Sequence, residues 1–167
     1  MTQELVDAIA EQEQRLVLDY FDENLAFTLG CALREHAAAS AAPVSIEIKS
    51  AARRYFFTTL SGATPENEDW GRRKGNTVLR TFKSSMRAGL EYGLEGREQW
   101  PDVGLPYSDF VIHGGGFPIT VKGVGVFAAI GVSGLPSVED HEMSTAILAD
   151  HLGLTGIALP DALKRLL

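Results

Sequence analysis

The segment His113-Gly114-Gly115-Gly116 combines a titratable imidazole with three consecutive glycines. Glycines leave their backbone N–H groups unshielded and adopt positive φ angles readily, so such a loop can approach a ligand closely or form an anion-binding nest. His113 can accept a proton, donate one or ligate a metal. The alternative interpretation is a tight turn that leads into a strand, with His113 at the surface.

Lys74 is the second residue whose position could carry chemistry. A spacing of four places a set of side chains on one face of a predicted helix: Trp70, Lys74, Val78 and Phe82. Because the other three are apolar, we expect them to be buried. A lysine in that stripe must extend its ammonium to solvent, pair with an acid or line a pocket. It is therefore either packed by its aliphatic stem on the core or positioned to bind a carboxylate or another anion.

Asp140 and His141 lie in the first turn of another predicted helix. The helix dipole favours an acid there, and His141 can simply be solvated. If the start of this helix contacts the glycine loop, however, His113, Asp140 and His141 would converge. Whether they would then bind a metal is left open, because two histidines and one aspartate are few for a metal site.

These residues are distributed over a regular succession of helices and strands. The spacing of apolar residues and the capping signals predict helices over residues 3–14, 22–39, 64–84, 86–99 and 135–152. Strands are expected over residues 16–18, 44–48, 55–60, 117–121 and 124–133. The last four form two hairpins, which suit an antiparallel sheet better than a doubly wound parallel one. We therefore expect a single α+β domain over residues 1–167, with helices packed on an antiparallel sheet.

The last predicted strand has two different faces. One carries larger apolar residues and is expected to be core: Val124, Val126, Ala128, Ile130 and Val132. The other is mostly small: Gly125, Phe127, Ala129, Gly131 and Ser133. Small residues indicate that something packs closely on that face, and a helix or another subunit is favoured over a ligand.

The charge balance excludes some partners. The chain has 22 acidic and 15 basic residues, a formal net charge of −7, which disfavours nucleic acid and an anionic membrane surface. Its one cysteine, Cys31, excludes an internal disulfide. The first 14 residues lack the basic region of a signal peptide, and the longest apolar run, 124–132, is too short to cross a bilayer. We expect a cytoplasmic protein.

Four motifs occur in order along the chain: Thr64-Pro65-Glu66-Asn67-Glu68-Asp69-Trp70, Arg72-Arg73-Lys74-Gly75-Asn76, His113-Gly114-Gly115-Gly116-Phe117-Pro118-Ile119, and Val132-Ser133-Gly134-Leu135-Pro136 with Glu139-Asp140-His141. Together they resemble an uncharacterised protein family that is placed with the haem-degrading, GlcG/HbpS-like domains, over about residues 4–152. The resemblance implies a profilin-like α+β fold and a homo-oligomer. It also implies haem as a ligand to consider, because some relatives in the wider superfamily bind it.

The first functional hypothesis is a small-molecule or cofactor-binding domain, with haem as the leading candidate ligand. The expected pocket residues are Trp70, Arg73, Lys74, Asn76, His113, Gly114, Gly115 and Phe117, with Asp140 and His141 as further candidates. His113 would be an axial ligand or proton donor. Arg73 and Lys74 would pair with the propionates.

Two other hypotheses remain open. In one, the protein is an enzyme acting on a small carboxylate or carbonyl compound. Lys74 would then hold the acid group, His113 would act as general acid or base, and the glycine N–H groups would stabilise an oxyanion. A small, polar cavity would favour this hypothesis. In the other, the domain is a non-catalytic oligomeric scaffold or adaptor, and the glycine loop is purely structural.

Overall fold

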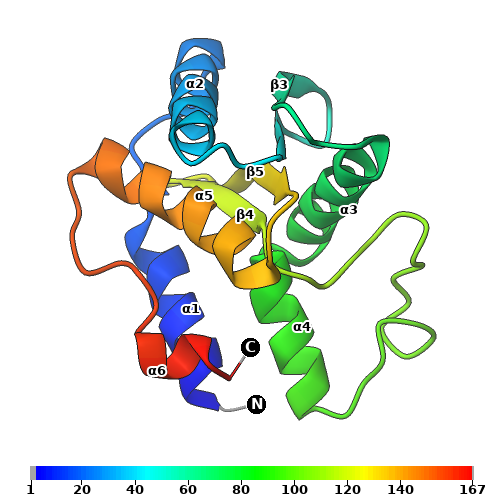
Figure 1. Ribbon diagram of the computed structural model, residues 1–167. Helices are drawn as coiled ribbons and strands as arrows, with labels where there is room; N and C mark the ends of the chain where they lie inside the picture. The colour runs from blue at the N-terminus through cyan, green and yellow to red at the C-terminus, as the bar shows by residue number, and fades with distance from the viewer. Residues whose placement is uncertain (1–2, 167) are drawn as a thin grey trace.

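The computed structural model describes residues 3–166, and its strands form one open sheet flanked by helices (Figure 1). In chain order the elements are α1 (Gln3–Arg15), β1 (Val17–Leu18), α2 (Glu23–Ala39), β2 (Ser45–Lys49), β3 (Arg54–Thr59), α3 (Pro65–Thr81), α4 (Ser85–Leu94), β4 (Gly116–Val121), β5 (Gly125–Ser133), α5 (Ser137–Leu152) and α6 (Asp161–Lys164). The predicted α+β fold is confirmed.

The sheet has the strand order β1-β4-β5-β2-β3. Both predicted hairpins form, β2 with β3 and β4 with β5, and β2 pairs with β5 in the centre; all three pairs are antiparallel. The short β1 differs, because it pairs with β4 in the parallel direction. The sheet is therefore antiparallel except at this edge.

Helices cover both faces of the sheet. α2 and α5 pack together on one face, and α3 packs across β2, β4 and β5 on the other (Figure 1). The large apolar side chains of the strands point toward α2 and α5, where they form the main core: Ile46, Ile48, Phe117, Ile119, Ala128, Ile130 and Val132. α1 and α4 pack on each other beside the sheet and bury a second, smaller cluster. Among the described residues, no helix is long and apolar enough to cross a membrane.

The small face of β5 receives α3, as predicted for a packed helix. A Cβ atom added at Gly131 would lie 2.6 Å from the carbonyl oxygen of Gly71, so the two backbones meet without intervening side chains. A Cβ atom at Gly71 would lie 3.8 Å from the oxygen of Gly131, which is ordinary contact. This close approach brings α3 down onto the end of β5, where Lys74 lies.

Some sequence expectations are wrong. α3 ends at Thr81 rather than Ser84, because Phe82 adopts a left-handed conformation (φ 57°) and Ser84 caps α4. Phe82 is consequently 63 % exposed instead of buried. Val124 was expected in the core but is exposed, since it precedes β5 in the turn of the hairpin. α4 stops at Leu94, short of the predicted residue 99. β2, expected to be half-buried, is buried on both faces.

The facing glycines provide a matched pair of substitutions. Gly131→Ala should lower the free energy of unfolding by about 1–3 kcal/mol, because its Cβ atom would meet the backbone of α3. Gly71→Ala should leave stability unchanged or raise it by up to about 1 kcal/mol, since alanine is the better helix former and the site has room. Urea unfolding of both variants measures the difference; equal effects would mean that the contact is not tight.

Candidate functional site

A pocket of about 260 Å³ opens where α3, the end of β5 and the start of α5 meet. Its lining combines six polar or charged side chains with a tryptophan, a glycine and a leucine: Asn67, Trp70, Lys74, His113, Ser133, Gly134, Leu135, Ser137 and Asp140. Four sequence-predicted site residues therefore meet here: Trp70 and Lys74 from α3, His113 from the loop before β4, and Asp140 from α5.

A buried ion pair forms the floor of this pocket. The ammonium of Lys74 lies 2.7 Å from Oδ2 of Asp140 and donates a second hydrogen bond, of 2.9 Å, to the carbonyl of Val132. Lys74 and Asp140 are 3 % and 1 % exposed. Burial lowers the pKa of Lys74, and the nearby Asp140 opposes this effect. Burial likewise raises the pKa of Asp140 against the influence of Lys74. Lys74 thus pairs with an acid instead of extending its ammonium to solvent.

Asp140 also forms hydrogen bonds with the backbone just before the start of α5. Its carboxylate accepts hydrogen bonds from the backbone N–H groups of Leu135, at 3.0 Å, and Gly134, at 3.4 Å. The same side chain therefore fixes the turn between β5 and α5 and neutralises the lysine of α3. Removing it would release both contacts together.

The glycine loop is held tightly between helices. Gly114 N–H donates to Ser137 Oγ at 2.6 Å, and Gly116 N–H donates to Ser85 Oγ at 3.0 Å. A Cβ atom at Gly114 would lie 2.2 Å from the carbonyl of Ser137, and one at Gly116 would lie 2.6 Å from the carbonyl of Lys74. Gly115 has a φ of 117°. Because two of the three N–H groups are already bonded, the loop does not form an open anion nest, and its glycines are explained by packing.

His113 stands at the mouth of the pocket against Trp70. The two rings are perpendicular (89°), with centroids 5.3 Å apart. The guanidinium of Arg73 lies over the Trp70 ring, 4.6 Å from its centroid, and forms an ion pair with Asp69 at 2.8 Å. Partial burial lowers the pKa of His113, and the positive charges of Lys74 and Arg73 lower it further. His113 is therefore a neutral imidazole at pH 7, able to accept a proton.

Sequence reasoning did not single out Asn67, Ser133 and Ser137 as site residues. Ser133 is 4 % exposed and lines the pocket, and its hydroxyl makes no hydrogen bond to any other described residue. Its position on the small face of β5, opposite the helix that carries Lys74, was the signal that could have indicated it. The residue as a whole is largely buried, but its hydroxyl oxygen remains accessible from the pocket, so a ligand atom there can bond to it.

Six of the ten candidate residues are not part of the lining. Arg73, Gly114 and Gly115 are close to residues that line the pocket, whereas the other three lie elsewhere. Asn76 accepts a hydrogen bond from Lys49 Nζ (2.8 Å) and donates one to the carbonyl of Asp109 (2.8 Å), outside this pocket. Phe117 is fully buried in the main core. His141 is fully buried against it, with ring centroids 5.5 Å apart.

His141 points away from Asp140 because successive residues of a helix are turned by about 100°. Its Nε2 atom lies 2.8 Å from Oε1 of Gln12 on α1. Burial lowers the pKa of His141 to about 4. Only His113 and Asp140 of the three converging candidates therefore share the pocket. Among residues 3–166, no group of three or more histidine, cysteine, aspartate or glutamate side chains could hold a metal ion.

Comparison with known proteins places this chain in a family. A family model described as "Haem degrading protein HbpS-like" matches residues 21–149. The chain belongs to the HbpS-like family. The match includes Lys74, His113 and Asp140 but neither α1 nor the segment after α5.

Individual proteins agree with this assignment. The chain is 44 % identical over 148 residues to a "UPF0303 protein" of Paraburkholderia phymatum, a match that covers 89 % of this chain and 90 % of that protein. It is similar to the crystal structure of the Ybr137w protein, with a TM-score of 0.82 and 27 % identity over 89 % of this chain and 87 % of the other. The fold is also shared with a PduOC–haem complex, at a TM-score of 0.65 and 18 % identity, covering 80 % and 94 %.

Lys74→Met should lower the free energy of unfolding by about 3–5 kcal/mol, because it leaves the Asp140 carboxylate buried without its partner. Adding Asp140→Asn to that variant should restore part of the loss, since the amide keeps an acceptor oxygen and carries no charge. Lys122→Met, at an exposed position, is the control. Chemical denaturation measures all three; an unchanged stability in Lys74→Met would refute a structural role for the pair.

His141 should make stability depend on pH. Its pKa is about 4 in the native state and about 6.5 in the unfolded chain, so below pH 6.5 the unfolded state binds the extra proton. The free energy of unfolding should therefore fall by about 2 kcal/mol between pH 7.5 and pH 5. His141→Gln should remove most of this slope, whereas His151→Gln, an exposed control, should keep it. Urea titrations at several pH values test this, and parallel slopes in both variants would contradict it.

Proposed function

We propose that this HbpS-like chain is a small-molecule-binding domain whose site is the pocket between α3, β5 and α5. The observation that carries the proposal is a small cavity into which Ser133 presents a hydroxyl with no partner among the described residues, with a neutral His113 at its mouth. Concave sites with a few convergent polar groups and a perturbed titratable residue are typical of ligand binding.

The charge of the floor favours a compact carbonyl compound over a fully charged anion. Asp140 already neutralises Lys74, so the pair offers no net positive charge to a carboxylate. An ammonium has three N–H donors, and two of those of Lys74 are engaged by Val132 and Asp140. The third N–H of Lys74 and the hydroxyl of Ser133 are donors that suit a carbonyl oxygen. His113 is the group positioned to exchange a proton with such a ligand.

Haem is the second candidate because of the family description and because PduOC, a protein of the same fold, forms a haem complex. The pocket itself does not fit an enclosed haem. At about 260 Å³ it is smaller than the roughly 300–1,000 Å³ of sites that enclose drug-sized ligands. Lys74 is engaged by Asp140, and Phe117 is buried in the core. A haem would have to lie across the mouth, against His113, Trp70 and Arg73.

A homo-oligomer and a cytoplasmic location remain predictions. An oligomeric scaffold without a ligand is the third interpretation of the chain, and His113 at an exposed rim is compatible with it. What favours a ligand is the Ser133 hydroxyl, which no other described residue bonds and which an atom in the pocket can reach. Light scattering after size-exclusion chromatography would determine the oligomeric state independently of any ligand.

Pyruvate, with acetone and acetate as carbonyl-only and carboxylate-only probes, tests the proposed ligand class. Titration should shift the backbone NMR signals of Gly134 and Ser137 saturably for the carbonyl compounds, and acetate should bind least. Ser133→Ala should weaken binding about tenfold, as expected for the loss of one hydrogen bond to a ligand. Thr58→Ala, on β3, is the control. No saturable shift with any probe would reject a carbonyl site.

Haemin titration of the purified protein separates the two candidates. Under the carbonyl proposal, any change in the Soret absorbance should be the same in the parent, in His113→Ala and in the exposed control His151→Ala. A saturable change that is lost in His113→Ala and retained in His151→Ala would instead make haem the ligand.

A further inference from the structure

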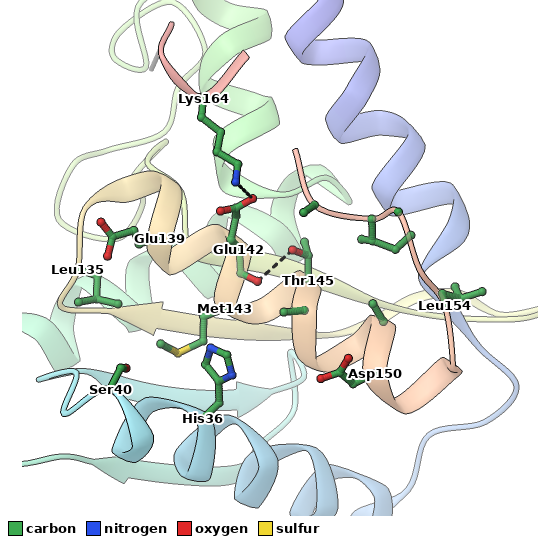
Figure 2. Close-up of a pocket in the computed structure, with 15 residues that line it drawn as sticks. His36, Ser40, Leu135, Glu139, Glu142, Met143, Thr145, Asp150, Leu154 and Lys164 are labelled. Carbon is green, nitrogen blue, oxygen red and sulfur yellow. Dashed lines mark hydrogen bonds and ion pairs between the residues drawn. The ribbon is translucent and has the colours of Figure 1, made fainter. Parts of the chain in front are cut away.

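A second and larger cavity, of about 470 Å³, lies between α2, α5 and the segment that follows α5 (Figure 2). Its volume falls within the roughly 300–1,000 Å³ that is usual for small-molecule sites. No motif in the sequence pointed to it, because its walls come from residues that are far apart along the chain. Residues 154–158 form one wall and lie beyond the family match at 21–149.

One side of the cavity is apolar. This side is lined by Met143, Ala146 and Ala149 of α5 and by Leu154 and Ile157 of the following segment. Methionine adapts its shape to irregular apolar ligands, and small alanine side chains leave room beside it. This wall can therefore take the hydrocarbon body of a ligand.

The polar side of the cavity carries an excess of negative charge. Glu139, Glu142 and Asp150 line it, all from α5, and Figure 2 shows Glu139 and Asp150 toward opposite ends of that helix. Lys164 is the one lysine or arginine in the lining, and it is already paired with Glu142 at 2.9 Å and Asp161 at 3.4 Å. Within residues 3–166, Glu139 and Asp150 take part in no ion pair, so two carboxylates face the cavity without a cationic side chain as partner.

Asp150 is placed against the preference of its own helix. It lies near the C-terminal end of α5, where the helix dipole favours cations and disfavours acids. His36 approaches the cavity from the last turn of α2 and points toward α5 in Figure 2. A positively charged ligand would relieve the unfavourable charge at the end of α5 and complement the rim.

We propose that this cavity binds an organic ammonium ion, with the hydrocarbon body against Met143 and the apolar wall and the charged nitrogen against Glu139 or Asp150. The combination of an apolar wall with uncompensated carboxylates at the rim selects for this class. A fatty acid or a haem would bring its own carboxylates against the same charges. The site shares only Leu135 with the lining of the pocket at His113, so it does not depend on the function proposed above.

The test compares two probes of the same shape and opposite charge. 2-Phenylethylammonium and 3-phenylpropionate are titrated into the ¹⁵N-labelled full chain, and backbone NMR signals report where each one binds. The ammonium should shift signals of residues 139–150 and 154–158 saturably, and binding should weaken as salt is added. The carboxylate should not bind there. Tighter binding of 3-phenylpropionate, or ammonium shifts centred on Trp70 and His113, would overturn the proposal.

Variants distinguish the contribution of the carboxylates from that of the cavity's shape to binding of the ammonium. The double variant Glu139→Gln/Asp150→Asn should raise the Kd of the ammonium about three- to tenfold, which is the range expected for losing exposed charge pairs. Glu68→Gln, an exposed acid on α3, is the matched control and should leave the Kd unchanged. Ala146→Leu fills the cavity without altering its charge and should abolish binding of the ammonium. Equal Kd values in parent, double variant and Ala146→Leu would refute the site, and His113→Ala should have no effect.

Discussion

The buried contact between Lys74 and Asp140 is the interaction on which the rest of this architecture depends. It joins α3, on one face of the sheet, to α5, which packs on the other, and it does so beside the end of β5. A charge pair with both members almost fully desolvated is costly to form and still more costly to break. It constrains where the turn after β5 can run, and hence where the pocket opens.

That constraint explains the concentration of glycine around the pair. The loop 113–116 threads between the carbonyl of Lys74 and the first residue of α5, so side chains larger than hydrogen would separate the elements that the ion pair holds together. The Gly71–Gly131 contact does the same one turn earlier on α3. In both places glycine allows two backbones to approach closely because it has no side chain. This close approach brings Lys74 within ion-pair distance of Asp140.

The sequence predicted most elements because their signals are local. Alternating residues marked the hairpins, and Asp22 and Thr64 marked helix starts that the structure confirms by side-chain hydrogen bonds to Leu25 and Asn67. The prediction that Phe82 is buried in α3 was wrong for a reason that the sequence does not reveal. Its apolar side chain continues the stripe of α3, but its backbone adopts the left-handed conformation that ends the helix.

The candidate site was predictable only in part. Lys74 stood out because its charge interrupts an apolar stripe. The local sequence did not show whether its ammonium would reach solvent, pair with an acid or line a pocket. Asp140 and His141 are neighbours in sequence but face different sides of α5, and the hydrogen-bond partner of His141 is Gln12, on a helix at the other end of the chain. The cavity beside α2 left no local signal, since His36, Met143 and Ile157 converge only through packing of the helices.

The two edges of the sheet are unequal. One edge carries β1, a parallel strand of only two residues, and the other is β3, with six residues whose outer backbone groups pair with no strand within residues 3–166. An edge strand presents unpaired N–H and C=O groups, and their number grows with the length of the strand. An added strand would therefore find a longer row of backbone partners along β3 than along β1.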